Sequence, residues 1–408
     1  MFAPLPSSEF GLVGHWVEGE SEYDGLDPVT FRRADTGDGT ENRIAAGRAW
    51  GSFEHSGWTV SAAASLLDSA NRNRLDGTPL NRTAGRRAAG RAQVSREFAG
   101  HRLTAAFERE AEDFQARDQS YFGATDQNRS RSLTAAVGEW QARWSDALST
   151  NIAVRHDGFS AFRDATTVRA AMTLQPSRRW TLLASYGEGI AQPTFYDLYG
   201  FFPGSFVGNP ALKPERSAGW ELGLTWRNRR AALRAAAFTN GLDSEIVDVF
   251  DPATFLSSTR NAGGTSRRRG IELAGEYRIS EAFQLLANYS FLDADERREP
   301  ADALLREIRR PRHSGNLIAS GQVGRLGWSA TAAYVGERDD LETDVFPAQR
   351  VRLGDYVLGS IRVGWKLTEA LEAYARIENA FGSDYQDVIG YGTPGRTVHA
   401  GLRIRLGS

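Results

Sequence analysis

Cysteine is absent from the 408 residues, which excludes disulfide bonds and thiolate metal sites in this chain. Lysine is nearly absent, because Lys213 and Lys366 are the only two and arginine supplies the other 47 of the 49 basic side chains. Codon bias explains this excess most simply, and the alternative is that arginine lines a wetted wall or contacts anionic lipid. The formal net charge of −2 argues against bulk binding of nucleic acid, so no nucleic-acid partner is expected.

Long apolar runs are also missing, and no stretch reaches the roughly 18 residues that a membrane-spanning helix needs. The first residues contain no basic segment followed by an apolar core, so no signal peptide is predicted. The patterns HExxH, GxSxG and GxxxxGKS/T do not occur, and the histidines show no metal-ligand spacing. The sequence therefore predicts neither an enzyme nor a cofactor site.

What the chain does have is hydrophobic alternation with a period of two residues. In the clearest run apolar residues alternate with polar residues or glycine, the apolar set being Val398, Ala400, Leu402, Ile404 and Leu406. Comparable alternation occurs at 220–226, 271–278 and 371–378. A strand places the two sets on opposite faces, whereas a helix would mix them, so the chain is predicted to be all-β.

About 18 such strands are predicted, many of them roughly 9–14 residues long against the usual five or six of soluble domains. Tight turns such as 54–57 alternate with long connections, among them 21–40, 68–80, 242–266 and 337–352. Aromatic residues often lie near the strand ends, as they do in interfacial girdles. These features favour a transmembrane antiparallel β-barrel, and the alternative is a soluble β-rich binding protein, whose half-buried strands also alternate.

Several motifs resemble those of one receptor family. Residues 185–200 read SYGxGxxxPTxxxLYG, and residues 208–223 read GNPxLxPExSxxWExG. The segments 260–279, 288–317 and 376–406 resemble late strands of the same family. Together these motifs are similar to TonB-dependent outer-membrane receptors, most closely the vitamin B12 and siderophore branch.

The resemblance implies an outer-membrane transporter that imports a scarce nutrient such as cobalamin or a ferric siderophore. Expected partners are outer-membrane lipid, a corrin or metal chelate as ligand, and the TonB–ExbB–ExbD complex as energy source. Full receptors of the family have 22 strands, a plug domain and a TonB-contacting box. Here a single barrel domain is expected over 1–408, with about 18 of those strands and without plug, box or signal peptide. The alternatives are a passive porin-like channel and a non-functional fragment.

The aromatic-rich segment 188–215 supplies most candidate ligand-binding residues. Aromatic side chains at a barrel mouth suit a flat, partly apolar ligand, although they also suit packing of the loop onto the rim. The candidates are Phe195, Tyr196, Tyr199, Phe201, Phe202 and Phe206, with Tyr121 and Phe122 in another long loop.

Polar residues that alternate with apolar ones are predicted to face the lumen: Glu221, Glu272, Arg376, Glu378 and Arg403. Pairs of these glutamates, Glu221, Glu272 and Glu378, with Arg269, Arg376 and Arg403 are expected across neighbouring strands. In the acidic segment 35–42, Asp35 and Asp38 are the candidate Ca²⁺ ligands. Because the segment lacks the spacing of a calcium loop, a polar loop is favoured and no metal site is predicted.

Overall fold

The computed structural model of the chain describes residues 7–405 apart from 28, 31, 121, 201, 203–204, 298–302 and 346, and it leaves out the side chain of Arg33. The chain divides into two compact units. Unit 1 comprises 1–171, 186–218 and 242–264, and unit 2 comprises 172–185, 219–241 and 265–408. Each unit is built around an antiparallel sheet.

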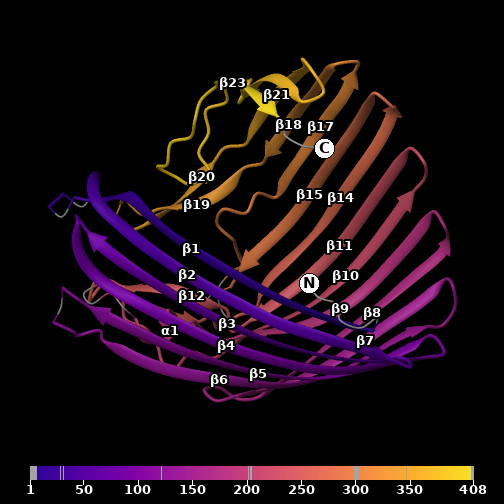
Figure 1. The fold of residues 1–408 in the computed structure, drawn as a ribbon. Coiled ribbons are helices and arrows are strands. Elements are labelled where there is room, and N and C mark those ends of the chain that lie inside the picture. The colour runs from indigo at the N-terminus through magenta and orange to yellow at the C-terminus, as the bar shows by residue number, and fades with distance from the viewer. Residues whose placement is uncertain are drawn as a thin grey trace. The chain divides into compact units, whose positions relative to one another are not determined.

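Unit 1 begins with a meander of long strands, which lie side by side in Figure 1. The strands are β1 (Ser8–Leu26), β2 (Arg33–His55), β3 (Trp58–Leu75), β4 (Thr78–Phe98), β5 (His101–Asp118), β6 (Gln127–Arg143) and β7 (Leu148–Phe159). Each strand pairs antiparallel with the next, and the turns at His55/Trp58 and Phe98/His101 are tight.

The same unit holds a short helix and a small separate hairpin. The helix is α1 (Phe195–Tyr199), and the hairpin consists of β12 (Ile246–Asp251) and β13 (Leu256–Asn261). No helix in the described part of the chain is long and apolar enough to cross a membrane.

Unit 2 is a second meander that ends the chain. Its strands are β14 (Ser266–Ser280), β15 (Phe283–Glu296), β16 (Leu305–Arg306), β17 (His313–Val323), β18 (Leu326–Val335), β21 (Tyr356–Lys366), β22 (Leu371–Glu378) and β23 (Thr397–Ile404), with a separate hairpin of β19 (Arg338–Glu342) and β20 (Gln349–Leu353). Four further strands contribute residues to both units along the chain: β8 (Ala165–Ser177), β9 (Trp180–Ala191), β10 (Glu215–Arg227) and β11 (Ala231–Asp243).

The registers give each sheet one apolar face and one polar face. In unit 1, Val60 lies opposite Val94 and Leu103 lies opposite Trp140, while the polar positions Arg91 and Glu108 pair on the other face. In unit 2, Leu273 lies opposite Tyr289 in the same way. Large apolar side chains on the apolar faces are exposed, for example Val60 at 52 % and Leu402 at 66 %. Such extended exposed apolar surface is typical of a protein whose strands contact lipid.

All 18 strands predicted from the alternation are present, so the period of two residues located them correctly. The prediction of about 18 in total was nevertheless too low, because the described residues form 23 strands. The five additional ones are β12, β13, β16, β19 and β20, which lie inside predicted long connections and span only two to six residues.

Two predicted connections were wrong, because most of 21–40 and 68–80 is strand. In these segments β1, β2 and β3 continue with mostly polar side chains on both faces, so no clear alternation marks them.

Candidate functional site

The motif PTFYDLYG folds as a capped helical turn in unit 1. Thr194 Oγ1 accepts a hydrogen bond from the Asp197 amide at 3.1 Å, and Asp197 Oδ2 accepts one from the Thr194 amide at 2.9 Å. This reciprocal capping box fixes the start of α1. Because Leu198 is buried, the helix presents its aromatic residues in a defined orientation.

The hairpin β12–β13 holds this turn in place. Asn209 Nδ2 donates to the Thr259 carbonyl at 2.9 Å, and Thr259 Oγ1 donates to the Asp197 carbonyl at 3.0 Å. Gly200, at the end of this motif, and Gly208, at the start of the GNP motif, allow the backbone to fold back on itself. A Cβ on Gly200, whose φ is +60°, would lie 2.4 Å from the Gly208 nitrogen. The segment is therefore an ordered element with its own hydrogen bonds.

Two of the predicted aromatic residues anchor the helix to the strands. Phe195 stacks on Phe114 of β5 with ring centroids 5.1 Å apart, and the Arg131 guanidinium lies 4.5 Å from the Phe195 ring. Tyr199 lies 4.3 Å from the guanidinium of Arg129 in β6. Phe195 and Tyr199 thus pack the loop onto the strands, which is the alternative to ligand binding named above.

A second aromatic group is more open. Tyr196 stacks on Phe206 at 4.4 Å, and Phe202 meets Tyr196 edge-on at 6.1 Å. Phe206 is buried at 8 % exposure, whereas Tyr196 is 36 % exposed. Burial, followed by the negative charges of Asp248 and Asp197, raises the pKa of Tyr196, so its hydroxyl stays neutral near neutral pH.

The remaining predicted aromatic residues do not join this group in the described structure. Phe122 is fully exposed in its loop, with a positive φ of 59°. Tyr121 and Phe201 lie outside the described residues. A ligand-binding role for all eight aromatic residues stays a prediction.

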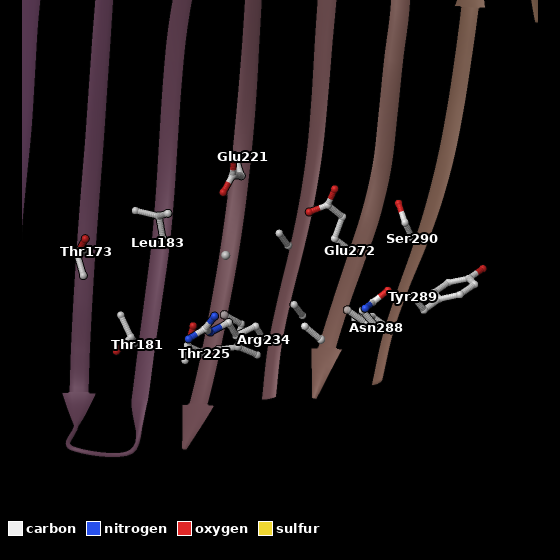
Figure 2. Close-up of a pocket in the computed structure, with 16 residues that line it drawn as sticks. Thr173, Thr181, Leu183, Glu221, Thr225, Arg234, Glu272, Asn288, Tyr289 and Ser290 are labelled. Atoms are coloured by element: carbon white, nitrogen blue, oxygen red, sulfur yellow. The ribbon is translucent and has the colours of Figure 1, made fainter. Parts of the chain in front are cut away.

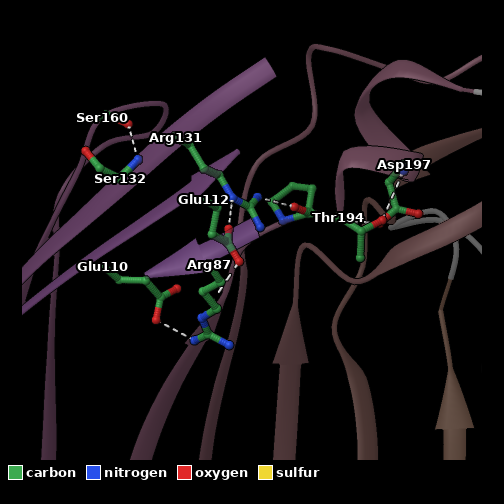
Figure 3. Close-up of polar contacts among 9 residues, drawn as sticks. Arg87, Glu110, Glu112, Arg131, Ser132, Ser160, Thr194 and Asp197 are labelled. Atoms are coloured by element: carbon green, nitrogen blue, oxygen red, sulfur yellow. Dashed lines mark hydrogen bonds and ion pairs between the residues drawn. The ribbon is translucent and has the colours of Figure 1, made fainter. Parts of the chain in front are cut away.

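An ion-pair network on the polar face lies to one side of the helix start in Figure 3 and reaches it through Pro193. Arg131 Nε donates to Glu112 at 2.5 Å, and Arg131 Nη1 donates to the Pro193 carbonyl at 2.7 Å. Arg87 pairs with Glu110 on the adjoining strands. Arg131 is a functional candidate that the sequence reasoning missed, although the facing charges of EREAED and NRSRS could have indicated it.

A shallow groove of about 620 Å³ on unit 2 contains two of the residues predicted to face a lumen (Figure 2). Glu221 and Glu272 lie on the same side, with Arg234 of β11 lower in the groove, and the ring of Tyr289 points away from the others. Glu221 and Glu272 are both exposed. A lumen-facing role for Glu221, Glu272, Arg376, Glu378 and Arg403 stays a prediction.

The predicted pairing of these polar residues was partly wrong. Glu378 pairs with Arg376 at 3.3 Å, but along one strand, and Arg403 approaches Glu372 at 3.8 Å. Arg269 bonds Asp293 instead of a polar-face glutamate. The reason is the alternation itself, because Arg269 shares its parity with Ile271 and so lies on the apolar face.

The two candidate calcium ligands are arranged differently from each other. Asp38 is 6 % exposed and accepts a hydrogen bond from the Asp76 amide at 2.7 Å, whereas Asp35 is exposed. Among the described residues no three His, Cys, Asp or Glu side chains come together as metal ligands. Asp35 and Asp38 therefore remain candidates only, and the sequence prediction of no metal site is unchanged.

Comparison with known proteins identifies a family and several relatives with this architecture. Residues 7–380 match the family model described as TonB dependent receptor-like, beta-barrel. The vitamin B12 transporter BtuB of Vibrio vulnificus (strain YJ016) is 30 % identical over 246 residues, which are 59 % of this chain and 36 % of that protein.

Solved structures show the same fold at low identity. The siderophore receptor PirA from Acinetobacter baumannii superimposes with a TM-score of 0.77 at 15 % identity, over 99 % of this chain and 69 % of that one. The copper transporter OprC gives a TM-score of 0.78 at 14 % identity, over 99 % and 70 %. The chain belongs to the TonB-dependent receptor-like β-barrel family, whose members are outer-membrane proteins.

Proposed function

We propose that this chain is the barrel portion of an uptake receptor whose cargo is a corrin or a metal chelate such as a ferric siderophore. The family consists of transport receptors. The related proteins are named for vitamin B12, siderophores, copper and iron, that is, for a metal complex, metal chelators and metals. The matched region spans about a third of the curated relative, so the activity of the whole protein belongs to this proposal.

The observation that carries the proposal is the ordered aromatic group at the long-connection end of unit 1. The half-exposed ring of Tyr196 is held by Phe206 and Phe202, and α1 is fixed by its cap and by β13. A preorganised aromatic surface binds a flat ligand without the entropic cost of ordering a loop. Such a surface suits the face of a corrin or of an aromatic chelate.

The contacts of the helix supply a route from the ligand to the wall. The Pro193 carbonyl, at the start of the helical turn, accepts a hydrogen bond from Arg131, and Arg131 in turn bonds Glu112 on the polar face. In the proposed cycle, ligand contact at Tyr196 shifts α1, and the shift reaches the strands through Arg131. TonB–ExbB–ExbD would supply the energy, and the polar faces would line the aqueous path.

Substitution of Tyr196 tests the proposal. Cyanocobalamin and a ferric catecholate siderophore are the probes, measured by binding to the protein in outer membranes. We expect Tyr196→Ala to weaken binding of one probe about tenfold or more, because it removes a stacking surface worth about 1.5 kcal/mol. The matched control is Tyr277→Ala, an exposed tyrosine on the apolar face of β14, which should leave binding unchanged.

Two outcomes would contradict the receptor. If the protein binds neither probe, or if both variants lose the same amount of binding, the aromatic group does not capture the ligand. Large, steady conductance that persists in a strain without TonB would show that the protein is a passive channel and not a receptor.

A further inference from the structure

Two arginine runs meet at the long-connection end of the sheet in unit 2. One run is 267–269 at the start of β14, and the other is 309–312, just before β17, with Pro311 inside it. Arg268 and Arg310 pair with Glu307 at 2.7 and 3.6 Å. Arg269 and Arg312 pair with Asp293, each at 2.8 Å.

The second group lies on the apolar face. In the register of β14 and β15, Arg269 lies opposite Asp293 and Ile271 lies opposite Phe291, two residues along each strand. Alternation therefore places Arg269 and Asp293 on the face of Ile271 and Phe291. Arg268 has the opposite parity and belongs to the polar face.

An aromatic layer adjoins this group on the same face. The Tyr289 hydroxyl lies 2.7 Å from His313 Nδ1, and the rings of Phe291 and His313 are 5.4 Å apart. Aromatic residues at the end of an apolar belt mark the border between hydrocarbon and headgroups. Arg269 and Arg312 thus stand at headgroup level, at the end with long connections, which is the extracellular end in barrels of this kind.

The group carries a net positive charge and free donors. Asp293, at 10 % side-chain exposure, lies between two guanidinium groups whose exposures are 70 % and 44 %. Arg269 uses Nε and Nη2 on Asp293, and Arg312 uses Nη2. Since each guanidinium has five N–H donors, several remain available on both arginines. Asp293 holds the two arginines in position while neutralising one of them.

We infer that Arg269 and Arg312 form a clamp for a phosphate group of the phosphorylated glycolipid in the outer leaflet of the outer membrane. Guanidinium groups bind phosphate through paired, charge-assisted hydrogen bonds. Basic groups at headgroup level recognise anionic lipid heads in the same way. The clamp requires the outer-membrane location of the family but neither the proposed cargo nor TonB, so it can fail independently of the proposed function.

The test compares two double variants, each of which replaces the two arginines that pair with one carboxylate. Arg269→Gln/Arg312→Gln removes the clamp. The control, Arg268→Gln/Arg310→Gln, removes the two arginines that pair with Glu307. Each protein is purified from outer membranes, and binding of bisphosphorylated lipid A, dephosphorylated lipid A and inorganic phosphate is measured by native mass spectrometry. The electrophoretic shift on heating, which folded membrane barrels show, verifies that each variant is folded.

The expected result is a preference for bisphosphorylated over dephosphorylated lipid A of about tenfold or more, which is lost in the clamp variant and kept in the control. Equal loss in both variants, or no preference for the phosphorylated lipid, would overturn the clamp. Inorganic phosphate binding as strongly as the lipid, with the same dependence on Arg269 and Arg312, would replace the lipid site with a site for free anions.

Discussion

At the scale of single residues, the least exposed charge in the described structure is Asp340 in β19, within the separate hairpin β19–β20 of unit 2. Its carboxylate is fully buried and accepts hydrogen bonds at 2.8 Å from the amides of Leu341 and Ile389 and from Arg309 Nε. Burial acts to raise the pKa of Asp340, but these hydrogen bonds outweigh it and hold the pKa below its usual value. Asp340 therefore links three backbone segments through one charge.

This link gives a prediction of pH dependence. Because the pKa of Asp340 is lower in the folded state than in the unfolded state, the stabilisation is complete above the unfolded value of about 3.9 and is lost as the pH falls through the folded value. Hydrogen exchange of 338–342 and 387–390 should therefore stay slow from neutral pH down to about 4 and rise below it, after correction for intrinsic rates.

Asp340→Asn is the matched variant for this prediction. It should exchange faster at neutral pH and lose most of the acid-dependent change, since no carboxylate remains to be protonated. An unchanged profile in this variant would assign the acid sensitivity to another group.

At the scale of elements, the short hairpins are the parts that the sequence did not reveal. Strands of only five or six residues are too short to show a measurable alternation, so β12–β13 and β19–β20 were predicted as loops. The hairpin β12–β13 nevertheless determines the geometry of the candidate site, because Asn209 and Thr259 tie it to α1. The motif predicted the aromatic residues, and the backbone contacts that orient them came from a segment without a recognisable pattern.

The contribution of this hairpin can be measured through Asn261. Its side chain donates to the carbonyls of Lys213 and Ser244 at 2.9 and 2.8 Å and accepts from the Lys213 amide at 2.8 Å. We expect Asn261→Ala to speed hydrogen exchange across 205–213 by tenfold or more, because the two hydrogen bonds to Lys213, worth about 1 kcal/mol each, are lost.

Asn316→Ala is a suitable control, since Asn316 bonds only the Asn288 side chain among the described partners, at 3.0 Å on the polar face of unit 2. Equal effects of the two variants on 205–213 would show that the hairpin does not hold the segment.

At the scale of the whole molecule, the period of two residues predicted most of the architecture. It located the 18 long strands and assigned Glu221 and Leu222 to opposite faces, because alternation depends on local sequence alone. Partners across strands were harder to predict, as the wrong assignment for Arg269 shows. Such partners depend on register, which a single strand does not contain.

Assignment of the faces to lipid and water gives a prediction for the whole molecule. Because the chain has no cysteine, a single introduced thiol reports its own position without background. Leu222→Cys on the apolar face should react slowly with a water-soluble maleimide, and a fluorophore there should be quenched by brominated lipid. Glu221→Cys, one residue away, should react fast and escape quenching. The reverse pattern would show that the face of Leu222 contacts water and the face of Glu221 contacts lipid.

The neighbouring residues Arg268 and Arg269 lie on opposite faces of β14. Each pairs with a different carboxylate, Arg268 with Glu307 and Arg269 with Asp293. A one-residue deletion between Gly270 and Asp293 would exchange the faces of everything on one side of it. Among natural relatives that keep both arginine groups, changes in length should accumulate in the connection 297–304 and be purged from the hairpin β14–β15, even where its side chains vary freely. The two arginine groups would thus restrict insertions and deletions in this hairpin.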